Sequence, residues 1–267
     1  MRPYCLALLC ILITNAYTAK AQIINIDKID TTAYVKKAKW NGIISSGIEI
    51  DKEKATLFDG TTSADVSLQK YKELFIGSAS ERFTAQDGTS FLNAGYTHLR
   101  WRHDYKAQLH TESFLQYQWD ENRGMMHRFV SGLNLRYNFW HRQAWEMTFA
   151  TGAFYEDELW NYRAVDSAKI PPNPTPQLSQ KIVSNTYVKW EGAPGPTSNI
   201  FIIIFYQAPY DEFFKPRLSM NVNFTVNVSK HFSFGLTYAG LYDVKPVVPI
   251  TKFYYSLANN LTYKFGG

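Results

Sequence analysis

The six histidines are the side chains of this sequence best suited to acid–base or metal chemistry. They are His98, His103, His110, His127, His141 and His231. A zinc site needs several His, Cys or carboxylate ligands brought together, usually with short spacings in the sequence. No two of these histidines share a strand face at a spacing of two, and both cysteines lie among the first ten residues. The sequence therefore predicts no metal site and no cofactor.

A serine hydrolase would need a Ser beside a His, with a third group to orient the imidazole. The segment His110-Thr111-Glu112-Ser113 contains all three residue types. On a strand, however, residues at an odd spacing point to opposite faces, so His110 and Ser113 cannot form a dyad. The sequence also has no Gly-rich phosphate loop and no nucleophile elbow. We expect no enzyme, and keep a hydrolase with partners distant in sequence as a minor alternative.

Charged side chains recur within segments that alternate between polar and apolar residues. The clearest segment, RLSMNVNFTVNVS at 217–229, places every apolar side chain at alternate positions. A period of two over this length indicates a β-strand with one apolar and one polar face. The same pattern predicts strands at 39–51, 61–71, 73 onward, 91–102, 106–119, 127–139, 144–156, 181–190, 200–207, 217–229, 232–242 and 252–265.

The apolar face of these strands must be covered by a protein core or by lipid. A soluble sandwich or lipocalin-like barrel, the alternative fold, would turn this face inward. Many predicted strands run 11–14 residues, which suits a tilted membrane crossing. Tight connections alternate with longer ones, as at the two rims of an outer-membrane barrel. The sequence thus predicts an all-β, transmembrane, antiparallel up-and-down β-barrel of about 12 strands, with long outer loops and short periplasmic turns.

Five of the seven tryptophans fall near the periplasmic ends of predicted strands. They are Trp40, Trp101, Trp140, Trp145 and Trp190. Tryptophan is enriched at membrane–water interfaces, so this set predicts an interfacial aromatic girdle.

The first 21 residues have the features of a cleaved secretory signal peptide. Arg2 precedes an apolar run, and Ala19-Lys20-Ala21 forms an A-x-A cleavage site. Cleavage would remove both cysteines and lower the formal net charge from +5 to +3, because Arg2 and Lys20 leave. This weak positive charge does not indicate a nucleic-acid partner. We predict a signal peptide at 1–21, a periplasmic or plug segment at 22–38 and an outer-membrane β-barrel at 39–267.

The polar face of the strands would line the lumen of the barrel. The predicted lumen-lining residues are His98, Arg100, Arg102, Glu112, Arg128, Arg136, Glu146, Lys189 and Lys264. Arg100, Arg128 and Arg136 come from the strands that flank Glu112, and neighbouring strands lie about 5 Å apart, so we expect a cationic arc around one carboxylate. Such an arc would act either as a filter that prefers anionic solutes or as an ion-paired network that fills the barrel and passes nothing.

One segment, IFIIIFY at 200–206, is apolar on both faces. The predicted inner patch consists of Val183, Tyr187, Phe201, Ile203 and Phe205. A strand that is apolar on both faces needs an apolar partner on each. The alternatives are the plug segment at 22–38, an oligomer interface, or a bound acyl chain.

Two stretches resemble a known group of bacterial proteins. They are KWNGIISSGIEIDKEKATLFDGTTSADVSLQKYKELF and LRWRHDYKAQLHTESFLQYQWDENRGMMHRFVSGLNLRYNFW. They are similar to the family of salt-induced outer-membrane β-barrel proteins, and the resemblance extends over about 39–265. It implies an outer-membrane barrel of unsettled function and no catalytic residues. Phe265 resembles the terminal aromatic residue of such barrels, from which Gly266 and Gly267 depart.

These observations lead to one expected function with two alternatives. We expect a narrow pore or transporter for small polar solutes, with anions favoured, in the outer membrane of a Gram-negative bacterium. Its partners would be outer-membrane lipid, lipopolysaccharide, the barrel assembly machinery and a small solute, but no nucleic acid. The alternatives are a closed structural barrel that supports envelope integrity and, less favoured, an outer-membrane enzyme that acts on lipid.

Overall fold

The computed structural model describes residues 35–52, 56–87, 89–104, 108–142, 144–229 and 232–263. The predicted signal peptide, Lys264 and the C-terminal Phe265-Gly266-Gly267 lie outside these residues and stay predictions. Within the described part of the chain, no helix is long and apolar enough to span a membrane.

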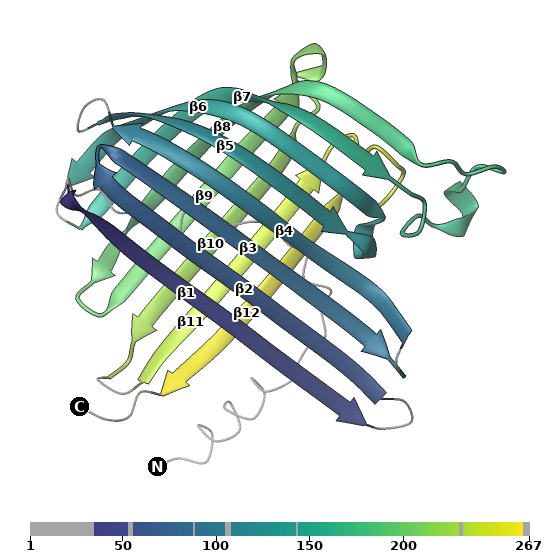
Figure 1. The fold of residues 1–267 in the computed structure, drawn as a ribbon, viewed down its shortest axis with the longest axis horizontal. Helices are drawn as coiled ribbons and strands as arrows, with labels where there is room; N and C mark the ends of the chain where they lie inside the picture. The colour runs from purple at the N-terminus through teal and green to yellow at the C-terminus, as the bar shows by residue number, and fades with distance from the viewer. Residues whose placement is uncertain are drawn as a thin grey trace.

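The described residues form twelve antiparallel strands in one sheet, whose spatial order is the order of the chain (Figure 1). The strands are β1 (Val35–Lys52), β2 (Thr56–Tyr71), β3 (Glu73–Gln86), β4 (Thr89–Asp104), β5 (Leu109–Asp120), β6 (Met125–Arg142), β7 (Trp145–Trp160), β8 (Gln177–Gly195), β9 (Ser198–Pro209), β10 (Arg217–Asn227), β11 (Phe232–Asp243) and β12 (Phe253–Tyr263). Three short 3-10 turns are η1 (Glu121–Arg123), η2 (Ser167–Lys169) and η3 (Tyr210–Glu212). The predicted all-β class, strand number and up-and-down topology are confirmed.

Several strands are longer than the sequence pattern predicts. β1 begins at Val35 rather than at 39, β2 begins at Thr56 rather than at 61, and β8 runs over Gln177–Gly195 rather than over 181–190. β3 continues to Gln86, although its alternation weakens after Ile76. These extensions lie beside partner strands, whose backbone hydrogen bonds hold a polar stretch as strand.

Longer connections gather at one end of the sheet. Those at 121–124, 161–176, 210–216 and 244–252 lie at this end, called the long-loop end. Residues 72 and 196–197 turn at the other end, called the short-turn end.

The sheet curls strongly, so that distant strands face each other across a concave side (Figure 1). The guanidinium of Arg123, between β5 and β6, lies 4.6 Å from the ring centre of Tyr254 on β12. Strands so far apart in the sheet order can approach only if the sheet bends back on itself. Within the described residues no ladder joins β1 to β12, so the sheet is curled but not closed.

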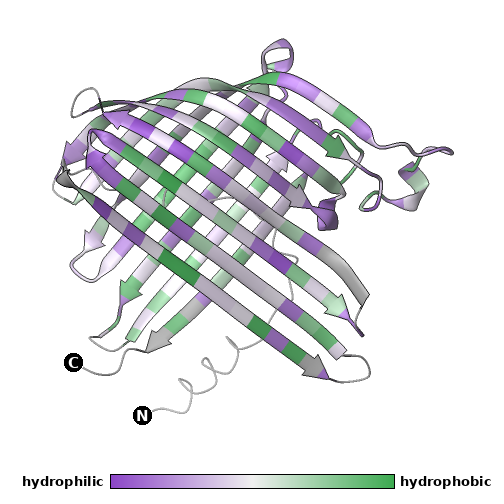
Figure 2. Cartoon of the chain, in the orientation of Figure 1, coloured by the Kyte–Doolittle hydropathy of each residue, from purple (hydrophilic) through white to green (hydrophobic). Residues whose placement is uncertain are grey.

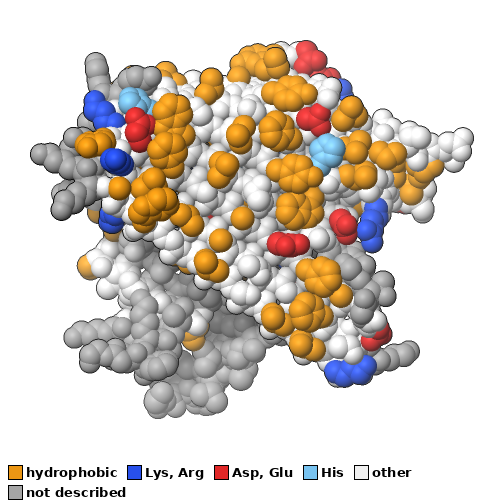
Figure 3. Space-filling view, viewed as in Figure 1, with side chains coloured by type: hydrophobic (Ala, Val, Ile, Leu, Met, Phe, Trp, Pro, Cys, Tyr) orange, Lys and Arg blue, Asp and Glu red, His pale blue; other side chains and the backbone are white. Residues whose placement is uncertain are grey.

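The two faces of the curled sheet have opposite character. Large apolar side chains are exposed on the convex face; Ile44 is 79% and Leu133 64% exposed. Charged side chains are buried on the concave face, where Glu112, Arg136 and Lys189 are each 0% exposed. Polar and apolar residues alternate as bands along many strands in Figure 2, and Figure 3 shows the apolar side chains gathered over the strands of one outer face. A soluble protein usually has the reverse arrangement.

The five tryptophans of the predicted girdle lie in the halves of their strands toward the short-turn end. Trp40, Trp101, Trp140 and Trp190 are exposed on the convex side, and Trp145 stacks on Trp190 with 5.2 Å between ring centres. Trp101 stacks on Phe75 of β3 at 6.4 Å.

Candidate functional site

The Glu112 carboxylate is the centre of a buried charged cluster on the concave face. The register of β4, β5 and β6 sets Arg102 and Asn134 on either side of Glu112. Its Oε1 accepts hydrogen bonds from Arg102 Nε at 3.3 Å and Arg136 Nη1 at 3.5 Å, and forms an ion pair with Arg100 Nη1 at 3.7 Å. These three guanidinium groups compensate the charge of the buried carboxylate.

A hydrogen bond across the concave side completes this cluster. The Tyr187 hydroxyl of β8 donates to Glu112 Oε2 at 2.8 Å. β5 and β8 are separated by two strands, so the bond spans the curl of the sheet rather than one ladder. Glu112 thus has charge-assisted partners on both oxygens, which is what a buried carboxylate requires.

A second cluster lies nearer the long-loop end and was not predicted from the sequence. Arg217 of β10 reaches two carboxylates of β7, with Nη1 2.8 Å from Glu158 Oε1 and 3.0 Å from Glu156 Oε1. Arg128 of β6 contacts the same two oxygens, with Nη2 2.6 Å from Glu156 Oε1 and Nε 3.1 Å from Glu158 Oε1. Arg217 Nε also binds Asp243 of β11 at 3.0 Å. Strands β6, β7, β10 and β11 are thereby linked through one group of charges.

Arg128 therefore belongs to a different cluster from the one predicted. The sequence placed it beside Glu112, but the register pairs Arg128 with Gln118. Gln118 lies six residues along β5 from Glu112, which is about 20 Å at the usual rise of a strand. The alternation pattern predicted the correct face for Arg128. The position of Arg128 along the strand direction depends on the register, which the pattern does not specify.

A third group of charges extends toward the short-turn end. Lys189 Nζ lies 2.7 Å from Glu191 and 3.7 Å from Glu146, and Arg136 Nη2 lies 3.7 Å from Glu146. With His98, which is 2% exposed and stacks on Phe114, all the predicted lumen-lining residues within the described chain lie on the concave face.

The predicted apolar patch divides into two small clusters. Val183 packs with Val130 and Phe154, and Phe114 lies against them. Tyr187 and Ile203 pack with Ala150, and Phe201 and Phe205 lie against these residues. Each cluster draws its described partners from neighbouring strands of the same concave face. The inner side of β9 thus packs against apolar side chains of β7 and β8.

An apolar cluster covers part of the long-loop end. Met125, Trp160, Val165, Val248 and Ile250 come from three different connections or the strand ends beside them. Arg123 lies over two aromatic rings at this cluster, 5.5 Å from that of Trp160 and 4.6 Å from that of Tyr254. The loops that contribute to this cluster have no periodic pattern. The signal for the cluster in the sequence is the run of apolar residues at 247–250.

Glu212 in η3 links the connection at 210–216 to the connection at 244–252 through ion pairs. Its carboxylate accepts hydrogen bonds from Lys245 Nζ at 2.7 Å and from Lys215 Nζ at 2.9 Å. These two ammonium groups hold the pKa of Glu212 at about 2, below its ordinary value of 4.5.

A small cavity of about 110 Å³ lies between the charged clusters. Four arginines from four different elements line it: Arg100, Arg123, Arg128 and Arg217. The other polar lining residues are His98, Gln116, Gln118, Asn134, Asn185, Tyr187, Gln207 and Ser219. Among the described residues that line the cavity there is no carboxylate. Its lining therefore offers cations, amide N–H groups and hydroxyl groups.

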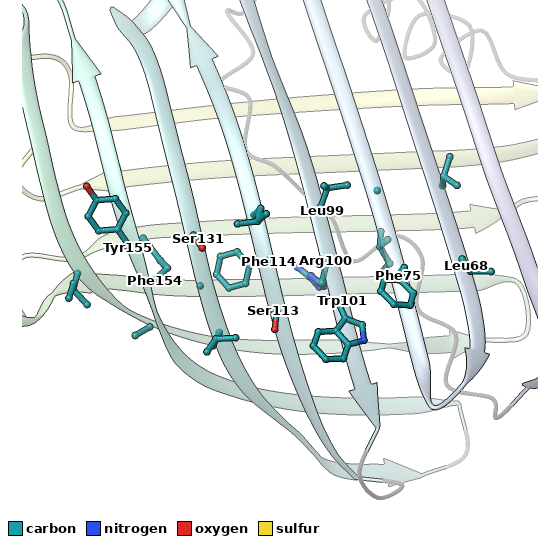
Figure 4. Close-up of a pocket in the computed structure, with 18 of the residues that line it drawn as sticks. Leu68, Phe75, Leu99, Arg100, Trp101, Ser113, Phe114, Ser131, Phe154 and Tyr155 are labelled. Carbon is teal, nitrogen blue, oxygen red and sulfur yellow. The ribbon is translucent and has the colours of Figure 1, made fainter.

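The convex face has a broad apolar depression of about 860 Å³ (Figure 4). Phe75, Leu99, Trp101 and Tyr155 are among its larger lining side chains, and Ser113 is among its small ones. This depression offers mainly apolar contact.

The described residues contain no group of three or more His, Cys, Asp or Glu that could hold a metal ion. Comparisons of the chain with family models, curated proteins and solved structures found no match. The resemblance to salt-induced outer-membrane proteins therefore stays a prediction.

Proposed function

We propose that this protein is an integral β-barrel of the outer membrane of a Gram-negative bacterium, with its convex face in lipid. The observation that carries the proposal is the inverted polarity of the sheet: apolar side chains outside and charged side chains buried inside. Contact between lipid and such an outer face costs no hydrophobic free energy. In water, the same face would be a large exposed apolar surface, which is unfavourable.

Membrane insertion also requires the edges of the sheet to pair, because an open edge leaves unsatisfied backbone groups in hydrocarbon. The proposal therefore includes pairing of β1 with β12. Strand lengths support it, since even the shorter strands, β10 and β12, have 11 residues, enough for one tilted crossing.

Within this barrel we propose a narrow path for small polar solutes that favours anions. The support is the arginine-lined cavity, where cations from several strands converge without an acidic lining residue among the described ones. A closed structural barrel is the second candidate. The ion pairs of Arg217 across the concave side and the apolar cluster at the long-loop end favour it, because both obstruct the interior.

Two measurements test the two parts of the proposal. The first asks whether unheated protein from outer membranes migrates on gels as a folded barrel and shifts on heating; recovery in the periplasmic fraction would reject the barrel. The second records currents in planar bilayers under a KCl gradient. We expect small discrete steps with anion preference.

Matched arginine variants make the second measurement specific. Arg100→Gln removes a cation from the cavity lining and should reduce the anion preference. Arg163→Gln removes an exposed arginine of the β7–β8 connection and should leave it unchanged. Folded protein that passes no current would reject the pore in favour of the closed barrel.

A further inference from the structure

The lining of the small interior cavity combines charged, polar and apolar side chains. The charged and polar lining residues include the four arginines and a series of side-chain amides. The apolar lining residues are Phe114, Met125, Phe205 and Leu241. We propose that this cavity is a binding site for one short-chain carboxylate, held by the arginines with its alkyl group against an apolar lining residue. This inference rests on the proposed barrel and names the class of anion that its interior takes.

One of the four arginines, Arg123, has a buried N–H donor that a ligand could use. A guanidinium carries five N–H donors in a planar fork that suits a carboxylate. Arg123 is only 6% exposed, and its Nε has no hydrogen-bond partner in the structure. A buried donor without an acceptor is costly, and a ligand oxygen in the adjoining cavity would satisfy it.

The amides on the cavity wall are already oriented by one another. Gln207 Nε2 donates to Asn185 Oδ1 at 3.1 Å, and Asn185 Nδ2 donates to Asn134 Oδ1 at 3.0 Å. This chain uses the carbonyl oxygens of Asn134 and Asn185 as acceptors. Each amide nitrogen retains a second N–H, so the wall offers donors to the oxygens of a ligand. Donors held in place in this way favour an anion over a cation or a neutral acceptor-poor solute.

The volume of the cavity limits the size of the ligand. A cavity of about 150 Å³ accommodates benzene, which has six non-hydrogen atoms. The cavity of about 110 Å³ therefore suits about four or five, the size of acetate or propionate. An inorganic oxyanion such as phosphate would bind the arginines and amides but gain nothing from the apolar lining residues. The combination of cationic and apolar lining residues selects a carboxylate with a short alkyl group.

Calorimetric titration of propionate into the full mature chain, folded in detergent micelles, tests the site. We expect one site with a dissociation constant on the order of millimolar, because the ligand is small. Propanamide has nearly the same shape without the charge and should bind at least tenfold more weakly. Inorganic phosphate should also bind more weakly than propionate.

A cavity-filling variant supplies the matched control. Ser219 of β10 lines the cavity, and Ser219→Leu fills it without removing a charge. This variant should lose propionate binding by at least tenfold. Met220 is the next residue on the same strand and alternates to the convex face, so Met220→Leu should bind propionate as the wild type does.

Four results would overturn the assignment: no propionate binding by folded wild-type protein, equal binding of propanamide, tighter binding of phosphate, or full binding by folded Ser219→Leu. The propanamide and phosphate comparisons hold even if Ser219→Leu does not fold. Binding without any current would reject the pore and leave the site standing. Anion currents without propionate binding would reject the site and leave the pore standing.

Discussion

Replacing Arg217 by Met should destabilise the protein far more than the loss of an ordinary ion pair. Arg217 of β10 forms ion pairs with Glu156 and Glu158 of β7, and it also binds Asp243 of β11. Glu158 is fully buried, and the side chain of Asp243 is 8% exposed. Methionine keeps much of the volume but leaves these carboxylates with fewer cations.

The magnitude follows from which partners remain. Glu156 and Glu158 keep Arg128, and Glu156 also keeps Lys181 at 3.4 Å, whereas Asp243 loses the guanidinium. Breaking a buried ion pair by removing one partner typically costs about 3–5 kcal/mol. The partners that remain place the expected loss near the lower bound, about 3 kcal/mol of unfolding free energy.

The measurement is equilibrium urea unfolding of protein folded into lipid vesicles, followed by tryptophan fluorescence. Arg163→Met is the matched control, because the Arg163–Glu121 pair is about half exposed on both sides and should contribute less than about 1 kcal/mol. A loss for Arg217→Met no larger than that of the control would refute the burial and pairing of Arg217 on the concave face.

Three further perturbations test the convex face, the packing inside the curl and a contact between two long loops. Leu133→Arg on the convex face should lower the unfolding free energy in lipid vesicles by about 2–4 kcal/mol, whereas Leu178→Arg near the long-loop end should lower it by about 0–1 kcal/mol. Equal losses for the two variants in an unfolding titration would reject contact of the convex face with lipid. Gly132→Ala should destabilise by about 1–3 kcal/mol, since a Cβ would lie 2.5 Å from that of a neighbouring phenylalanine, whereas Gly47→Ala meets no atom within 4 Å and should be neutral. The pKa of Glu212 is lowered from 4.5 to about 2, so the stability contributed by its carboxylate is fully present above pH 4.5 and is lost as the pH falls toward about 2. Wild-type protein should therefore lose unfolding free energy relative to Glu212→Gln over that pH range. Parallel pH profiles of stability for the two proteins would contradict this.

The sequence could predict which face each side chain occupies, because alternation is a local property of a strand. Val222 and Asn223 differ in polarity and point to opposite faces, as their neighbours do along the whole of β10. Pairing in chain order also follows from short connections. The same reasoning placed Glu112, Arg102 and Arg136 on one face of three adjacent strands, where they do meet.

Contacts across the curl could not be predicted in this way. Tyr187 meets Glu112 and Arg217 meets Glu158 because the sheet bends, and the bend results from twist and packing summed over many strands. Register was the second missing quantity, as the displacement of Arg128 from Glu112 demonstrates. The apolar cluster at the long-loop end was missed for a third reason: its residues lie in connections or at the strand ends beside them, where no periodic pattern exists to read.

The charged interior is easier to explain by a solute than by stability alone. Replacing buried ion pairs with apolar side chains of similar volume is often neutral or stabilising, so a barrel that only had to be filled would not need them. The interior nevertheless combines apolar clusters, such as that around Ile203, with arginines from β4, β6 and β10 whose carboxylate partners lie outside the cavity lining. Acidic residues that hold these guanidiniums in place, while amides and arginines face the cavity, form an arrangement suited to an anion that enters and leaves. This arrangement favours a solute-binding path over a purely structural barrel.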